Sequence, residues 1–158
     1  MAITQFLMNY ALTSPVTITM NGLAHAAARE STLVDNSANK YRDYSAIVTI
    51  STLTNPGLGI DKAVYIYPYG SPDKTNCDYI CTGTDAAITL GTHNLPGPYV
   101  CSLQAVGTLH TWVIGSVAQF FGGNIPQYFG FVVHNMASAT FLGSDCTLSV
   151  QGLYDSAS

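Results

Sequence analysis

Short β-type runs separated by turn residues recur along almost the whole chain, and they constrain the fold more than any other feature of the sequence. Thr, Val, Ile and Tyr fill these runs, and Asn, Gly, Pro, Asp and Ser interrupt them at short intervals. In TSPVTITMNG, Val16, Ile18 and Met20 fall on one side of an extended chain, whereas Thr17 and Thr19 fall on the other. This alternation predicts strands with one buried face.

The same reading gives eight or nine strand candidates. After TSPVTITMNG they are SAIVTISTL (45–53), KAVYIYPYG (62–70), AAITLG (86–91), YVCSLQAV (99–106), LHTWVIGSV (109–117), YFGFVVHNM (128–136) and CTLSVQGLYD (146–155). Only GLAHAAAR (22–29) has some helical character, and an isolated octamer is marginal as a helix in water. We therefore expect an all-β, single-domain antiparallel β-sandwich over 1–158 with roughly eight strands. A jelly roll is the favoured topology, although alternation alone does not separate it from an immunoglobulin-like one. Residues 1–15 are a candidate extended N-terminal arm.

Charge is scarce, and this argues against several classes of partner. Five Lys and Arg stand against nine Asp and Glu, which gives a net charge of −4. Five basic residues do not make the large basic patch that replaces phosphate counterions, so we expect no nucleic-acid partner. No apolar run is long enough to span a bilayer, and the N-terminus lacks the pattern of a signal peptide. We expect no membrane partner and synthesis in a cytosol. With 47% hydrophobic residues, the chain either has a dense core or covers much of its surface with neighbours.

The four cysteines do not form a metal-binding motif. Cys77 and Cys81 have three residues between them, and no second pair of Cys or His completes a zinc site. The simplest interpretation is that Cys77, Cys81, Cys101 and Cys146 act as small buried hydrophobic residues. A disulfide formed outside the cell stays open, and its pairing does not follow from the sequence.

The candidate catalytic and ligating residues are also isolated. His25, His93, His110 and His134 belong to no motif with a known mechanism. Asp35, Asn36 and Asp43 offer oxygen ligands for calcium, but the calcium-loop pattern is absent and such residues are ordinary turn formers. We therefore expect no enzymatic activity, no cofactor and no metal.

The stretch FGGNIPQYFGFVVHN (121–135) raises the sharpest question, since it ends in His134 and is rich in glycine and aromatics. Gly122, Gly123 and Pro126 suit a turn between two strands, and Gly130 suits a close backbone approach or a bulge. Large aromatic side chains here and elsewhere are candidate anchors of the core or of an interface: Phe120, Phe121, Tyr128, Phe129, Phe131, Trp112, Tyr65 and Tyr67.

Three segments together resemble a group of small structural proteins of tailed bacteriophages. These segments are ARESTLVDN (28–36), DKAVYIYPYGSPD (61–73) and FGGNIPQYFGFVVHNMASATF (121–141). The group has an R-x-S…DN segment, a tyrosine-rich segment ending in YGS-D, and a C-terminal fGG-xP-xxWG-vV-N segment. Here Phe129 stands where that group usually has Trp, and Ala137-Ser138 where it often has a turn ending in Gly.

The resemblance implies a non-enzymatic virion component that binds the outer surface of the capsid and stabilises the head, as decoration or cement proteins do. Its expected partners are the major capsid protein and neighbouring virion subunits, and a homotrimer is the expected assembly. Two alternatives stay open. One is a tail or neck structural protein. The other is a jelly-roll carbohydrate- or receptor-binding module that uses Tyr65, Tyr67, Tyr69 and Trp112 as stacking platforms.

Overall fold

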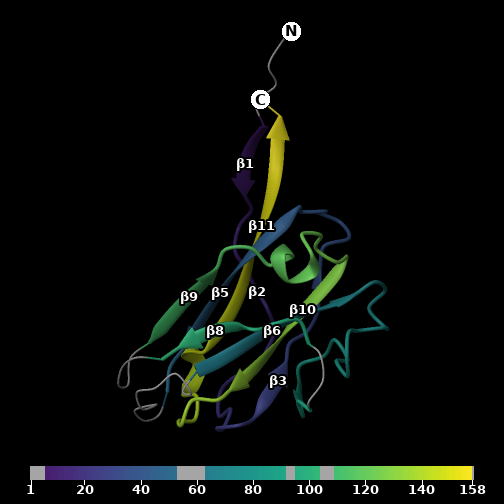
Figure 1. Cartoon of the computed structure of the whole chain (residues 1–158). Helices are drawn as coiled ribbons and strands as arrows, with labels where there is room; N and C mark the ends of the chain where they lie inside the picture. The colour runs from purple at the N-terminus through teal and green to yellow at the C-terminus, as the bar shows by residue number, and fades with distance from the viewer. Residues whose placement is uncertain (1–5, 53–62, 92–94, 104–108, 158) are drawn as a thin grey trace.

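The protein is a sandwich of two antiparallel β-sheets (Figure 1). The computed structural model describes residues 6–52, 63–91, 95–103 and 109–157. Eleven strands and two short 3₁₀ helices are present in these ranges. The predicted all-β sandwich is confirmed. The alternating sequence pattern folds in this way because each sheet has one apolar face, and two such faces bury each other.

The first sheet, sheet A, is built around the long C-terminal strand. Its order is β1-β11-β5-β9, and β2 also pairs with β11. The strands are β1 (Phe6–Tyr10), β2 (Ser14–Pro15), β5 (Asp43–Ile50), β9 (His110–Ile114) and β11 (Thr147–Ala157). The predicted N-terminal arm therefore contains two strands that lie along β11.

The second sheet, sheet B, is built around the strand that contains the C-terminal part of FGGNIPQYFGFVVHN. Its order is β7-β3-β10-β6-β8, and β4 also pairs with β10. The strands are β3 (Ala28–Glu30), β4 (Val34–Asp35), β6 (Ala63–Ser71), β7 (Ala86–Ile88), β8 (Tyr99–Ser102) and β10 (Tyr128–Asn135).

The strand order is that of a jelly roll. We count β1 with β2 as one interrupted strand, count β3 with β4 as another, and set aside the edge strand β7. Each sheet then contains four strands, in the orders 1-8-3-6 and 2-7-4-5. Eight strands wound between two sheets in this order form two Greek keys, which is the jelly-roll arrangement. The two interruptions and β7 account for the difference between the expected eight strands and the eleven observed.

One local expectation differs from the structure, and the one stretch with some helical character does not become a helix. The alternating run at 16–20 is not a strand, because after Val16 the chain leaves the edge of β11 and crosses toward sheet B, where the Thr32 amide donates to the Thr17 carbonyl oxygen at 2.9 Å. GLAHAAAR forms turns and then β3 rather than a helix, and Ala26 adopts a left-handed φ of 62°. Tertiary pairing with β10 prevails over weak helix propensity at this point.

The main core lies between the sheets. Side chains that alternate inward from β5, β6, β10 and β11 fill it, among them Val48, Ile50, Ile66, Phe131 and Leu148. All five are at most 2% exposed. The inner faces thus follow the two-residue alternation of these strands.

A second, smaller cluster lies on the outer face of sheet B. Tyr69, Ala28 and Val132 from the sheet pack against Cys81 and other residues of the connection from β6 to β8. Buried Glu30 on β3 holds this connection by accepting hydrogen bonds from the Thr82 amide and hydroxyl, at 2.8 and 2.6 Å. The connection thus covers part of sheet B as a third layer.

The helical content is limited to η1 (Ala118–Phe121) and η2 (Gly143–Asp145). No helix in the described ranges is long and apolar enough to cross a membrane.

Candidate interaction surfaces

The predicted aromatic anchors separate into three environments. Phe129 and Phe131 are completely buried in the core, with their rings edge to face and their centroids 5.8 Å apart. Phe120, Phe121 and Trp112 are half-buried and pack against that core from its margin. Tyr128, Tyr65 and Tyr67 are half-buried residues of sheet B. These eight residues therefore do not form one surface.

The glycines and proline of FGGNIP lie in the connection between β9 and β10. Gly122 and Gly123 have φ values of 67° and 90° and end η1, a conformation that favours glycine. Pro126 packs its ring over Gly70 of β6, where a Cβ would lie 2.8 Å from the proline Cγ. The segment therefore ends η1 and covers β6.

His134 is half-buried and lies beside Tyr65, with a ring separation of 6.3 Å. Burial lowers the pKa of His134, and a hydrogen bond with the backbone of Ala26 opposes this effect. The adjacent Asn135 is completely buried and donates to the carbonyl oxygens of Leu23 and Ala139. The His-Asn pair thus lies where loops from both ends of the chain join β10.

The candidate carboxylates accept hydrogen bonds that stabilise turns and join neighbouring segments. Asp35 accepts hydrogen bonds from the amide and hydroxyl of Ser37, and Asp43 accepts one from the Ala118 amide at 2.8 Å. A hydrogen bond from Lys74, followed by those from Ser37, lowers the pKa of Asp35 to about 2. Within the described ranges, no three His, Cys, Asp or Glu side chains are grouped so that they could hold a metal ion.

The cysteines are all thiols in the structure. Cys81, Cys101 and Cys146 are buried and Cys77 is partly exposed. Burial raises the pKa of Cys81 and of Cys101 to about 12, so both stay protonated at neutral pH.

Much of the outer face of sheet A is uncharged. Nine neighbouring uncharged residues of β2, β5, β9 and β11 lie on the side away from the core, and all but the buried Ser45 are at least partly exposed: Pro15, Ser45, Ile47, Thr49, Thr111, Val113, Thr147, Ser149 and Gln151. Val113 is 59% exposed, and Ile47 lies beside it in register, with Ser149 on the other side of Ile47. We call these nine residues the A face. Sequence reasoning missed it as a surface, because its members come from four separate strands.

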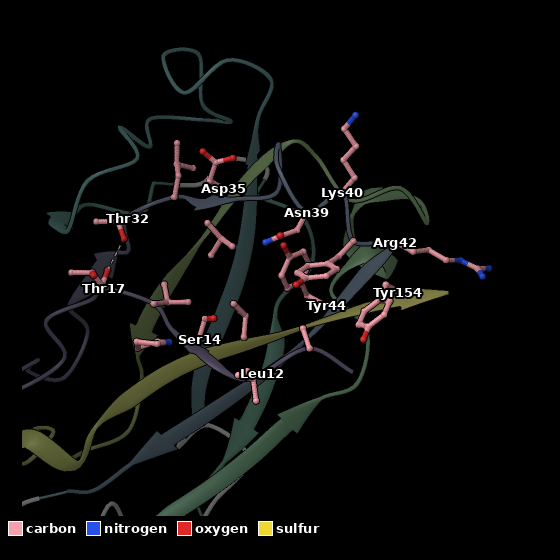
Figure 2. Close-up of a pocket in the computed structure, with 18 of the residues that line it drawn as sticks. Leu12, Ser14, Thr17, Thr32, Asp35, Asn39, Lys40, Arg42, Tyr44 and Tyr154 are labelled. Carbon is pink, nitrogen blue, oxygen red and sulfur yellow. Dashed lines mark hydrogen bonds between the residues drawn. The ribbon is translucent and has the colours of Figure 1, made fainter. Parts of the chain in front are cut away.

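A groove of about 1150 Å³ opens where β2 at the edge of sheet A faces β4 at the edge of sheet B (Figure 2). The pair Thr17 and Thr32 lies toward one end of the groove, and Lys40 and Arg42 extend away from it at the other. Tyr41 lies against Gly152 of β11, where a Cβ would be 2.1 Å from its ring. A glycine inside a predicted strand was the signal that could have located this aromatic contact.

The four proposed sugar-stacking aromatics are not on one platform. Tyr69 is completely buried, and Trp112 lies on β9 of the other sheet, where it stacks on His110 with centroids 5.7 Å apart. Tyr65 and Tyr67 remain as a stacked, half-buried pair on the outer side of β6, with centroids 6.4 Å apart.

Comparison with known proteins adds no relative: no family model matches the chain, and neither a curated protein nor a solved structure matches it.

Proposed function

We propose that the protein is a non-enzymatic structural component of a tailed-phage virion that binds the outer surface of the head and stabilises it. The A face is the observation that carries this proposal. Its nine side chains are uncharged, and Pro15, Thr111, Val113 and Thr147 are exposed. The resemblance of the three sequence segments supplies the class of partner, and the A face supplies a surface for it.

The physical argument is one of desolvation. A partner that covers charged side chains must remove their water, at a cost that ion pairing often fails to return. The A face has Thr, Ser, Gln, Pro, Ile and Val side chains, whose hydroxyl and amide groups need hydrogen-bond partners but carry no charge to desolvate. Asp43, the first residue of β5, is charged and points to the same side as the A face, but it already accepts a hydrogen bond from the Ala118 amide. A head subunit could therefore cover this surface without burying an unpaired charge.

The test is a co-sedimentation experiment with particles of the phage that encodes the chain. Expanded heads that lack the protein, and isolated tail tubes, are each mixed with the purified protein. We expect saturable binding to heads and an increase in the temperature at which the heads open, since a ligand of the assembled state stabilises it by mass action. Binding to tail tubes in place of heads would assign the protein to the tail or neck.

A charged substitution on the A face tests the surface itself. Val113→Lys places an ammonium group in the exposed part of the face and should weaken head binding on the order of tenfold or more. The control is Ala38→Lys, which adds the same charge at an exposed turn outside the A face and should leave binding unchanged. Equal binding by both variants would remove the A face from the proposal.

A carbohydrate-binding role is the second candidate, and the stacked pair Tyr65 and Tyr67 is the observation in its favour. Such a pair offers two aromatic faces to a sugar chain. A glycan array read with the wild type and with Tyr67→Ala tests it. A hit that disappears in the variant supports this role, whereas an array without hits opposes it.

A further inference from the structure

The C-terminal strand β11 extends beyond the sheet that it anchors. Its pairing with β5 stops at Leu153, which is opposite Asp43. From that point to Ala157 it pairs only with β1, in a register that sets Tyr10 opposite Leu153 and Phe6 opposite Ala157. The two strands form a ribbon that projects from the body of the sandwich (Figure 1). We call β1 with residues 153–157 the terminal ribbon.

Along both outer edges of the terminal ribbon, backbone amides and carbonyls point outward, as they do at the edge of a sheet. The Ala11 amide donates to the Gly152 carbonyl oxygen, and the Arg42 amide donates to that of Leu153 on the other side of β11. Because backbone groups alternate along an antiparallel pair, the amides and carbonyls of residues 6, 8 and 10 point away from β11. Those of residues 155 and 157 point to the side where β5 has already ended. Among the described residues, no strand pairs with either edge.

Such a ribbon is unfavourable on its own. A two-stranded antiparallel pair is marginally stable in water, and an open edge is a template for another chain. The sequence of β1, FLMNY, has none of the Lys or Pro residues that natural edges use to prevent pairing. Tyr10 and Tyr154 are 60% and 40% exposed at the base of the ribbon. The ribbon therefore has the features of a strand pair that is completed by association.

Further copies of the same chain can pair with both open edges of the ribbon. In a ring with its axis along the ribbon, β1 of one copy lies beside β11 of the next. The two run antiparallel, because β1 and β11 are antiparallel within each copy. A closed ring leaves no edge unpaired, whereas a twofold pairing of β1 with β1 would leave both β11 edges open.

Strand spacing sets a lower limit on the number of copies. With strands about 4.8 Å apart, two copies would give four strands that close at roughly 7 Å and leave too little room for side chains. Three copies give six strands and a tube at least roughly 10 Å across, which is the usual spacing of two sheets packed face to face, so three is the smallest number of copies that closes. Charge does not oppose the ring, since β1 is uncharged and Asp155 is paired with Arg42 at 3.1 Å.

We propose that three copies of the chain join their terminal ribbons into a six-stranded antiparallel barrel. The inference goes beyond the proposed head binding, because it concerns strand edges rather than the A face and is tested on the isolated protein.

The experiment measures the mass of the full chain by light scattering on a sizing column, together with its thermal unfolding. The wild type should have three times the 16.8 kDa of one chain. Met8→Pro removes an amide that points out of β1 and should give a monomer, whereas Met8→Thr keeps the amide and should stay trimeric. Asp155→Pro and Asp155→Ala make the same comparison at the opposite edge, and the alanine variant controls for loss of the Arg42 pair.

A monomeric or dimeric wild type overturns the barrel, and so does a proline variant that is folded and still trimeric. If a proline variant fails to fold, hydrogen exchange on the wild type decides. Slow exchange of the Met8 and Asp155 amides supports pairing between copies, and exchange at the rate of exposed amides contradicts it.

Discussion

The ring of Tyr69 lies over Gly130, and its hydroxyl donates a hydrogen bond to the carbonyl oxygen of Ser31, 2.7 Å away. Tyr69 and Gly130 are register partners on β6 and β10. A Cβ on Gly130 would lie 2.4 Å from the Tyr69 Cζ. One side chain therefore joins three neighbouring segments of sheet B, and the glycine provides the space for it.

Gly130→Ala should destabilise the protein by about 1–3 kcal/mol, because the added methyl group pushes the ring of Tyr69 out of its position. Urea unfolding measures the change. In the background of Tyr69→Ala, where the ring is absent, the same substitution should cost much less. Equal costs in the two backgrounds would show that Tyr69 is not the reason for glycine at this position.

Asn135→Asp should cost about 3 kcal/mol, since an aspartate cannot donate to the carbonyl oxygens of Leu23 and Ala139 and has no exposure to water. The control is Asn124→Asp, the same chemical change at an exposed loop position, which should stay within about 0.5 kcal/mol of the wild type. Similar unfolding curves for the two variants would contradict the role of Asn135 as the polar centre of these loops.

The free energy of unfolding should decrease at acidic pH, because Asp85 becomes protonated. Burial opposes its ionisation, but hydrogen bonds from Arg29 and Thr19 outweigh this effect and lower the pKa of Asp85 from 3.8 to about 2. A depressed pKa in the folded state gives stability that is present above the unfolded value and is lost as pH falls through the folded one. We expect this ion pair to contribute about 1–2 kcal/mol at neutral pH and to lose it progressively below about pH 4. Unfolding of Asp85→Asn measured against pH should show a shallower acid limb than the wild type.

Thiol titration should separate Cys77 from the buried cysteines. At about pH 8, an aromatic disulfide reagent should label the folded protein slowly and at Cys77 first, since burial keeps the others protonated and covered. Denaturant should expose all four thiols, and Cys77→Ser should remove the early phase. Fewer than four reactive thiols in the unfolded, unreduced protein would indicate a disulfide.

Period-two alternation determined much of this protein from its sequence. It predicted an all-β sandwich, because the pleat sends every second side chain to the same face whatever the partner strand is. The glycine inside a predicted strand indicated a close backbone approach or a bulge at Gly130, and the structure shows the ring of Tyr69 there instead.

The tertiary structure alone decided which strands became neighbours, and the surfaces follow from that choice. The A face joins residues as distant as Pro15, Val113 and Gln151, and the ring of Tyr41 meets Gly152 across more than a hundred positions of sequence. The terminal ribbon exists only because β5 ends before β11 does, a mismatch of strand lengths that alternation within either strand does not encode. Local pattern fixes the face on which a side chain lies, whereas long-range pairing fixes the neighbours on that face.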